Sequence, residues 1–164
     1  MKNHMLKLFL FFAIFQLSQI LQAKELTHRL GVGPRYNSSI QLSEVGVSYY
    51  PSENIGFIGG MGIDTQENNS KFSLNGTVRR LVFQESEKNM MVYFGGRLGM
   101  ISYEDTQKYS GYELSAVFGG EFFLQGLESL GFCFETGVGI VSGKNVRFRS
   151  FADLPFQAGV FFYF

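Results

Sequence analysis

The sequence of 164 residues is long enough for one domain, and it carries 14 basic and 14 acidic side chains. Its net charge of zero gives no electrostatic basis for binding nucleic acid, and its one cysteine, Cys133, excludes an intrachain disulfide. Phenylalanine (19), tyrosine (8) and glycine (20) are abundant and proline (3) is rare, a composition that favours β-strands over helices.

Residues 1–23 predict a cleaved secretory signal peptide. Two lysines precede a short apolar run at 8–15, and the segment ends on the small residue Ala23. The run is too short for a membrane-spanning helix, which needs roughly 20 apolar residues, and a retained membrane anchor is the alternative interpretation. Cleavage after Ala23 leaves one domain at 24–164, and the loss of the two lysines changes the net charge from 0 to −2.

After the signal peptide, apolar and polar residues alternate with a period of two in stretches of roughly ten residues. This pattern predicts strands that are long enough to cross a membrane when tilted. The eight predicted strands cover 27–36, 40–50, 55–64, 71–83, 90–103, 112–123, 131–141 and 155–164. The alternation slips near Ser43, which indicates a β-bulge there.

One face of each predicted strand is apolar and almost free of charge, whereas 12 of the 20 glycines fall on the other, polar face. A soluble barrel would bury the apolar face, and a membrane barrel would turn it outward toward lipid. The signal peptide, the small polar face and the uncharged apolar face favour the membrane barrel. Aromatic residues near the strand ends, as in a membrane-interface girdle, add to this: Tyr36, Tyr49, Tyr103, Tyr112 and Phe156.

The chain after residue 23 resembles the small eight-stranded outer-membrane β-barrels of the OmpA/OmpX type. The resemblance rests on the turn at 49–56 (YYPSENIG), on the segments 119–123 (GGEFF) and 134–139 (FETGVG), and on the ending 162–164 (FYF). It implies an all-β, antiparallel, up-and-down transmembrane barrel in the bacterial outer membrane, with both termini in the periplasm. The turns at 51–54, 84–89 and 125–130 would be periplasmic, and the loops near 37–40, 65–70, 104–111 and 142–154 extracellular.

The last strand also resembles the signal that the outer-membrane assembly machinery reads, because apolar residues recur at every second position up to a terminal aromatic residue. The predicted assembly signal consists of Phe156, Val160, Phe162 and Phe164. We therefore expect a monomer whose partners are the assembly machinery during biogenesis and outer-membrane lipid and lipopolysaccharide afterwards, with no nucleic acid among them.

The same alternation points eight charged side chains into the barrel. They are Arg29, Arg35, Arg79, Arg97, Glu44, Glu113, Glu121 and Glu135. Four positive charges against four negative charges predict a paired network, because an unpaired buried ion costs several kcal/mol. Glu121 and Glu135 are nearly equidistant from the turn at 125–130, so we expect them opposite each other with Arg97 between them. A salt-bridged plug is favoured over a gate or an ion path.

No residue pattern predicts catalysis, a metal site or a cofactor. Lipid A-modifying barrels resemble hydrolases with a histidine, a serine and often an acid, but after residue 23 the only histidine is His28, near the expected periplasmic edge. Cys133 is interpreted as a small interior residue. Lys144, Arg147 and Arg149 in the last loop are candidates for contact with lipopolysaccharide phosphates, with a merely solvated loop as the alternative.

The sequence thus predicts an integral outer-membrane barrel with a structural or interaction role and a salt-bridged, non-conducting lumen. Two alternatives stay open. One is a narrow channel or transporter for small or hydrophobic molecules, and the other, with less support, is a lipid A-modifying enzyme.

Overall fold

The computed structural model describes residues 26–84, 89–105, 107–124, 126–150 and 157–164. Within these residues the chain forms nine β-strands, and it has no helix of the length and hydropathy that crossing a membrane requires. The strands are β1 (Leu30–Asn37), β2 (Leu42–Ser52), β3 (Ile55–Asp64), β4 (Lys71–Gln84), β5 (Met90–Glu104), β6 (Lys108–Phe123), β7 (Leu130–Val141), β8 (Arg147–Arg149) and β9 (Gln157–Tyr163).

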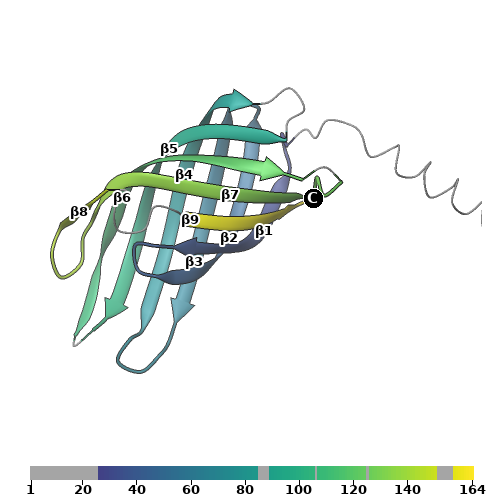
Figure 1. Ribbon diagram of the computed structural model, residues 1–164. Coiled ribbons are helices and arrows are strands. Elements are labelled where there is room, and N and C mark those ends of the chain that lie inside the picture. Colours follow the sequence, from purple (N-terminus) through teal and green to yellow (C-terminus); the bar gives the residue numbers. More distant parts are fainter. Residues whose placement is uncertain (1–25, 85–88, 106, 125, 151–156) are drawn as a thin grey trace, which may run out of the picture.

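The strands pair antiparallel with their neighbours and close into a barrel (Figure 1). From β1 to β7 each strand pairs with the next one along the chain, and β9 pairs with β1. Two strands share the eighth position of the barrel, because β7 pairs with β9 through residues 130–135 and with β8 through residues 139–141. The predicted all-β, eight-stranded, antiparallel barrel is therefore confirmed.

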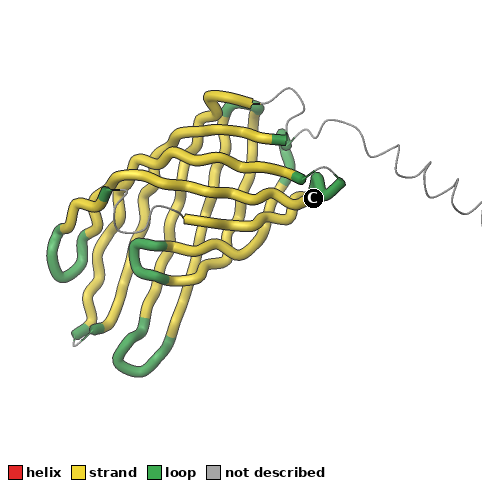
Figure 2. The backbone as a smooth tube through the Cα atoms, in the orientation of Figure 1, coloured by secondary structure: helices red, strands yellow, loops and turns green. Residues whose placement is uncertain are grey.

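The two ends of the barrel differ (Figure 2). The terminus end holds the connections β2–β3, β4–β5 and β6–β7 together with the last residue, Phe164. The loop end holds the connections β1–β2, β3–β4, β5–β6 and β7–β8. This is the alternation expected of an up-and-down barrel, in which each strand reverses the direction of the one before.

The predicted strand bounds are close to the observed ones. The third predicted strand has the bounds of β3, and the predictions for β4, β5 and β7 each differ by one residue at one end. The predicted loop after β7 was too long, because three of its residues pair with the end of β7 and form β8. Period-two alternation identified the long strands well, but a strand of three residues is too short for the pattern to be recognised.

Two details near the first hairpin are corrections. The first strand starts at Leu30 and not at Thr27, because His28 has a left-handed backbone (φ 66°) that turns the chain, and Leu26 is buried in the barrel. The bulge expected near Ser43 is not found, since β1 and β2 pair without a shift from Leu30 to Asn37. The pairing of β2 with β3 shifts instead between Tyr49 and Ser52.

Side chains alternate between the inside and the outside of the barrel as the sequence predicts. The large apolar side chains of the strands are exposed, with Val45 and Ile63 each 61% and Leu98 64% accessible. Arginine, glutamate, asparagine, serine and threonine side chains are buried instead. The predicted outward direction of the apolar face is confirmed. Among the predicted girdle residues Tyr36, Tyr49 and Tyr112 are exposed, Tyr103 packs inside, and Phe156 is outside the described residues.

Apolar side chains gather inside the barrel in two clusters. One is formed by Leu26, Tyr50, Ile58, Met91, Tyr93, Phe123, Cys133, Phe161 and Tyr163, with Leu81 packed against it. The second, nearer the loop end, consists of Ile40, Leu42 and Ile101, with Tyr103 and Val141 packed against it. The buried charged residues lie on strand segments between these two clusters.

Candidate functional site

Charged side chains fill the middle of the barrel. Seven of the eight charged residues expected there are buried, namely Arg35, Arg79, Arg97, Glu44, Glu113, Glu121 and Glu135. Arg29 does not join them. It precedes β1, is half-buried, and takes part in none of the ion pairs found among the described residues. The turn at His28 leaves Arg29 at the very end of the barrel, which alternation along a continuous strand could not indicate.

Glu135, on β7, is the centre of the charge network. Its Oε1 accepts hydrogen bonds from Arg79 Nη2 at 2.9 Å and from the Tyr93 hydroxyl at 3.1 Å. Its Oε2 accepts hydrogen bonds from Arg35 Nη2 at 2.8 Å and from Arg97 Nη2. Three guanidinium groups from β1, β4 and β5 thus converge on one carboxylate from β7. Hydrogen bonds to charged partners are the strong ones, so these contacts tie the walls of the barrel together across its interior.

Glu121, on β6, lies nearer the terminus end and is held by two tyrosines. Its Oε2 accepts a hydrogen bond from Tyr50 Oη at 2.6 Å, and its Oε1 accepts one from Tyr163 Oη at 2.5 Å. Arg79 Nη1 is 3.4 Å from Oε2 and forms the ion pair. A buried carboxylate is stable only when paired and hydrogen-bonded, and these three donors satisfy Glu121.

The predicted position of Arg97 between Glu121 and Glu135 is wrong. Arg79 bridges the two carboxylates, whereas Arg97 pairs with Glu135 and, at 3.6 Å, with Glu113. The reason is the register of β6 and β7, in which Glu121 lies opposite Cys133 and Glu135 lies opposite Gly119. The two carboxylates are offset by two residues, and the side chain that reaches the space between them comes from β4.

Arg79 also has contacts that an ion-pair pattern does not predict. Its guanidinium carbon lies 4.2 Å from the centre of the Tyr93 ring, a cation–π contact. Its Nη2 is 3.0 Å from Cys133 Sγ, and the Tyr93 hydroxyl is also 3.0 Å from that sulfur. Cys133 is therefore a small buried residue at the centre of the barrel, as predicted.

Glu44, on β2, is satisfied by amides instead of arginines. Asn37 Nδ2 donates to its Oε1 at 2.7 Å, and Asn75 Nδ2 donates to Oε1 at 2.8 Å and to Oε2 at 3.0 Å. Asn75 in turn accepts a hydrogen bond from Arg35 Nη1 at 3.0 Å. Glu44 is thereby linked to the arginines through one asparagine, and alternation had not identified Asn37 and Asn75 as part of the network.

Glu113, on β6 toward the loop end, is the least satisfied carboxylate. Its Oε1 accepts a hydrogen bond from Ser115 Oγ at 3.3 Å and lies 3.6 Å from Arg97 Nη1. Its Oε2 is buried without a hydrogen-bond partner among the described residues. With Arg29 outside the network, three buried arginines face four buried glutamates among the eight predicted residues. Arg149, half-buried with an enclosed Nε, is a further cation that lines the same cavity as Glu113.

Aromatic side chains close the terminus end of the lumen. Tyr163 packs against Phe123 with ring centres 5.7 Å apart, and against Tyr50 and Phe161 with ring centres 6.4 Å apart. One small cavity at this end, lined by Leu26, Tyr50, Met91 and neighbouring residues, has a volume of about 10 Å³. A space of that size holds at most about one water molecule. In the part of the chain that the structure describes, aromatic and apolar side chains therefore close the terminus end.

Glycines on neighbouring strands make room for these aromatic rings. A Cβ atom at Gly56 would lie 2.6 Å from Cε1 of Tyr50, and one at Gly31 would lie 2.6 Å from Cε1 of Tyr163. Real Cβ atoms do not approach other carbon atoms so closely, since cores are packed at close to crystal density. The glycine-rich polar face that the sequence showed thus accommodates buried side chains that reach across the lumen.

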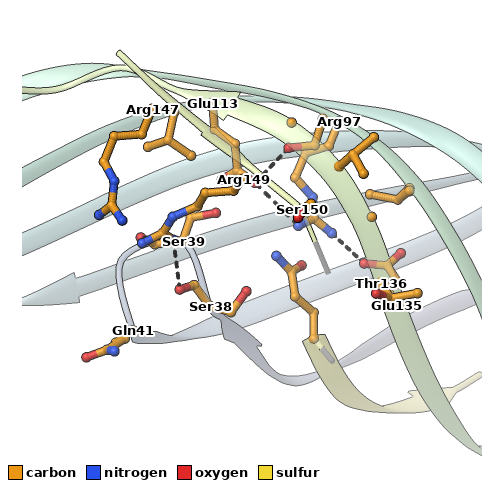
Figure 3. Close-up of a pocket in the computed structure, with 17 residues that line it drawn as sticks. Ser38, Ser39, Gln41, Arg97, Glu113, Glu135, Thr136, Arg147, Arg149 and Ser150 are labelled. Carbon is orange, nitrogen blue, oxygen red and sulfur yellow. Dashed lines mark hydrogen bonds and ion pairs between the residues drawn. The ribbon is translucent and has the colours of Figure 1, made fainter. Parts of the chain in front are cut away.

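The loop end of the lumen is open. A cavity of about 260 Å³ lies above Glu135 (Figure 3), and its lining includes Arg97, Glu113, Ser115, Gln157, Arg147, Arg149, Ser38 and Ser39. A second, wider hollow of about 460 Å³ shares Ser39, Gln41, Val141, Arg147 and Arg149 with it. The two hollows meet at the short strand β8, so the cavity opens toward the loop end and is blocked toward the terminus end.

The remaining predicted residues lie at the two ends of the barrel. Lys144 is exposed, with its ammonium 5.6 Å from the centre of the Tyr109 ring, and Arg147 is exposed on β8. Arg149 turns inward, and its Nη1 donates to the carbonyl oxygens of Ser39 at 2.8 Å and Ser38 at 3.4 Å. Contact of these three cations with lipopolysaccharide stays a prediction, and for Arg149 the inward direction makes it less direct.

The residues of the predicted assembly signal lie on the outer face where the structure describes them. Phe162 and Phe164 are exposed, Val160 is half-buried, and Phe156 lies outside the described residues. His28 is exposed, and its Nδ1 is 3.5 Å from the Tyr49 hydroxyl. No group of three or more His, Cys, Asp or Glu side chains within the described ranges is arranged to hold a metal ion.

Sequence reasoning missed the two tyrosines that hold Glu121. Tyr163 shares the parity of Gln157 and Gly159, which the sequence places on the polar face, and Tyr50 shares that of Ser48. Both could have been included in the interior network, but their apolar rings suggested no such role.

The chain matches no protein-family model, and no match is found for it among curated proteins or solved structures.

Proposed function

We propose that this protein is an integral β-barrel protein of the bacterial outer membrane, with a structural or interaction role and a lumen that does not conduct. The observation that carries the proposal is the reversed distribution of side chains, with charges inside and large apolar groups outside. Soluble monomers rarely expose contiguous apolar patches larger than a few hundred Å². A bilayer gives such a surface an apolar solvent.

The dimensions of the wall support the same proposal. A tilted strand needs about 9–11 residues to cross the hydrocarbon core. β2 has 11 residues, β3 has 10 and β7 has 12, while β4, β5 and β6 are longer still. β1 has 8 residues and β9 has 7 within the described residues. With the terminus end in the periplasm, the connections of the loop end would face the outside, and Phe162 and Phe164 would be available to the assembly machinery.

The closed terminus end and the ionic network support a non-conducting lumen. Buried side chains from β1, β4, β5, β6 and β7 meet in the middle of the barrel. An ion would have to displace these charge-assisted hydrogen bonds and then pass the aromatic layer around Tyr163. The proposed role is therefore a stable, plugged membrane barrel that acts through its outer surface and its loop end.

A substitution in the apolar surface tests the membrane location. Leu98 is 64% exposed in the middle of β5. In a membrane barrel Leu98→Lys costs about 2–4 kcal/mol near the bilayer centre and lowers the yield of folded protein in the membrane fraction, whereas on a soluble protein it is harmless. The control is Asn69→Lys in the exposed β3–β4 connection.

Cell fractionation and heat-modifiable migration on a gel measure the outcome for both variants. Recovery of the wild-type protein and of Leu98→Lys in the soluble fraction, in equal amounts, would refute the membrane location. Planar-bilayer recording on the folded protein tests the plug separately. Stable conductance steps would contradict the non-conducting lumen and support the narrow-channel alternative.

A further inference from the structure

Glu113 brings an unsatisfied acceptor to the cavity at the loop end. Its side chain is 2% exposed, and its Oε2 lies buried without a hydrogen-bond partner among the described residues. The other oxygen, Oε1, accepts from Ser115 and pairs with Arg97, so the carboxylate is held in place by one of its two oxygens. Buried polar atoms in folded proteins are nearly always hydrogen-bonded. A buried acceptor on the lining of a cavity of about 260 Å³ is therefore expected where a bound molecule supplies the donor.

The cavity lies where the wall of the barrel changes from one strand to another. β9 pairs with β7 as far as Glu135, and β8 pairs with β7 from Gly139 onward. Residues 136–138 of β7 pair with neither of these two strands, and all three line the cavity. The cavity is thus built into the fold at the point where the eighth position of the barrel passes from β9 to β8.

The lining of this cavity favours an uncharged ligand. The carboxylate of Glu113 and the guanidinium groups of Arg97 and Arg149 all occur on it (Figure 3). Because both signs of charge are present on one lining, neither a simple cation nor a simple anion fits it throughout. Most of the other polar side chains on the lining carry hydroxyl or amide groups, among them Ser39, Ser115 and Gln157.

A hydroxyl group is the ligand group that matches these neighbours. It donates its hydrogen to an acceptor such as Glu113 Oε2, and it accepts hydrogen bonds from amide or hydroxyl donors such as Gln157 and Ser39. An ammonium group only donates and a carboxylate only accepts. Several hydroxyl groups on one small molecule can therefore be satisfied together in a lining that mixes donors and acceptors.

The adjoining hollow offers room for a longer molecule of the same kind. Its volume is about 460 Å³, and it shares Ser39 and Gln41 with the deeper cavity. Its lining adds the amide groups of Asn68 and Asn145 and the ring of Tyr103. Amides both donate to hydroxyl groups and accept from them, and an aromatic ring offers an apolar face to the C–H groups of a sugar ring.

We propose that the loop-end cavity binds an uncharged saccharide, with one hydroxyl group of a sugar unit donating to Glu113 Oε2 and a second unit, in longer ligands, in the adjoining hollow. The cavity of about 260 Å³ lies just below the usual range for small-molecule sites, which fits a single sugar unit. Aromatic and apolar side chains close the terminus end in the described part of the chain, so the saccharide enters and leaves through the loop end. This goes beyond the proposed structural role and does not depend on the membrane location.

Isothermal titration calorimetry on the detergent-folded protein tests the site. The detergent is lauryldimethylamine oxide, because a detergent with a sugar headgroup would compete. The probes are glucose, galactose, mannose and maltose. The controls are tetrahydropyran, which has the sugar ring without hydroxyl groups, and the single-charge molecules butylammonium and butyrate. We expect saturable binding of at least one sugar, about tenfold or more tighter than each control, because a hydrogen bond to a charged group contributes a factor of that order.

Glu113→Gln should weaken the binding of that sugar about tenfold, since an amide oxygen is a weaker acceptor than a carboxylate. Glu44→Gln is the matched control, because Glu44 is also a buried glutamate, is held by Asn37 and Asn75, and does not line the cavity. It should leave the affinity within about twofold, a change below the contribution of one hydrogen bond.

A second variant keeps the test decisive if Glu113→Gln does not fold. Ser39→Trp places a large ring where the cavity and the adjoining hollow meet and should abolish sugar binding, whereas Ser52→Trp, at the exposed end of β2 on the terminus end, should not. The proposal is overturned if no sugar binds saturably, if any control molecule binds as tightly as the best sugar, or if folded Glu113→Gln or Ser39→Trp binds sugar like the wild type. Each of these results is obtained on folded protein and leaves the membrane location untouched.

Discussion

Replacement of Arg79 by methionine is the strongest test of the interior network. The Arg79 side chain is fully buried, and among the described residues it is the one cation that pairs with both Glu121 and Glu135. Methionine keeps the unbranched stem of arginine but lacks the guanidinium head, so the substitution removes the charge and leaves a small void in its place. We expect Arg79→Met to fold into the same barrel with a much lower free energy of unfolding.

The expected loss of unfolding free energy follows from the contacts that Glu121 and Glu135 keep in the variant. Glu135 retains Arg35 and Arg97, but Glu121 loses its only ion pair among the described residues and keeps just the hydroxyl groups of Tyr50 and Tyr163. Removing one member of a buried ion pair typically costs about 3–5 kcal/mol, because an uncompensated charge stays behind. The double variant Arg79→Met/Glu121→Gln removes that charge as well and should recover part of the loss.

The control is Arg80→Met, the next residue of β4, whose side chain is exposed on the opposite face. Surface substitutions of this kind stay within about 0.5 kcal/mol. Because the chain contains no tryptophan, urea unfolding in lipid vesicles is followed by far-ultraviolet circular dichroism and by heat-modifiable gel migration. If Arg79→Met unfolds at the same urea concentration as Arg80→Met, the interior network does not stabilise the barrel and the reasoning fails.

Three further predictions test other parts of the barrel. Arg97→Ala should lower the thermal unfolding midpoint of the detergent-folded protein, since it strips one guanidinium from Glu135, and an unchanged midpoint would contradict its place in the network. Gly56→Ala should destabilise the barrel by about 1–3 kcal/mol in urea unfolding, because the new Cβ atom collides with the buried Tyr50 ring. Gly76→Ala, whose Cβ atom meets open space on the outer face, should leave the stability unchanged. Equal stabilities of the two variants would refute the role of Gly56 as a spacer. Phe164→Ala should reduce assembly into the outer membrane in cells while leaving spontaneous folding into detergent unchanged, and a parallel loss in both assays would indicate a purely structural role for this residue.

The sequence by itself determined the strands and the direction of their side chains. A strand places successive side chains on opposite faces, so alternation along residues 90–103 fixed both the extent of β5 and the burial of Arg97. Both properties are local, because they depend only on neighbours along the same strand. The prediction of an eight-stranded barrel with a charged interior followed from repeating this reading for each segment.

The tertiary structure alone decided which interior residues meet. Arg79 and Glu135 are 56 residues apart, and their contact depends on the register of every strand pair between β4 and β7. An offset of two residues between β6 and β7 was enough to give the bridging position to Arg79 instead of Arg97. Alternation repeats every two residues, so it is unchanged by such an offset and carries no information about it.

The structure at the two ends of the barrel was also not predictable from the sequence, for a related reason. The left-handed turn at His28 brings Leu26 into the interior and leaves Arg29 at the edge, and β8 covers part of a predicted loop. These features depend on single backbone conformations and short pairings and not on a repeated pattern. The pairing of β8 with β7 places Arg147 and Arg149 on the lining of the loop-end cavity, a position that only the tertiary structure decides.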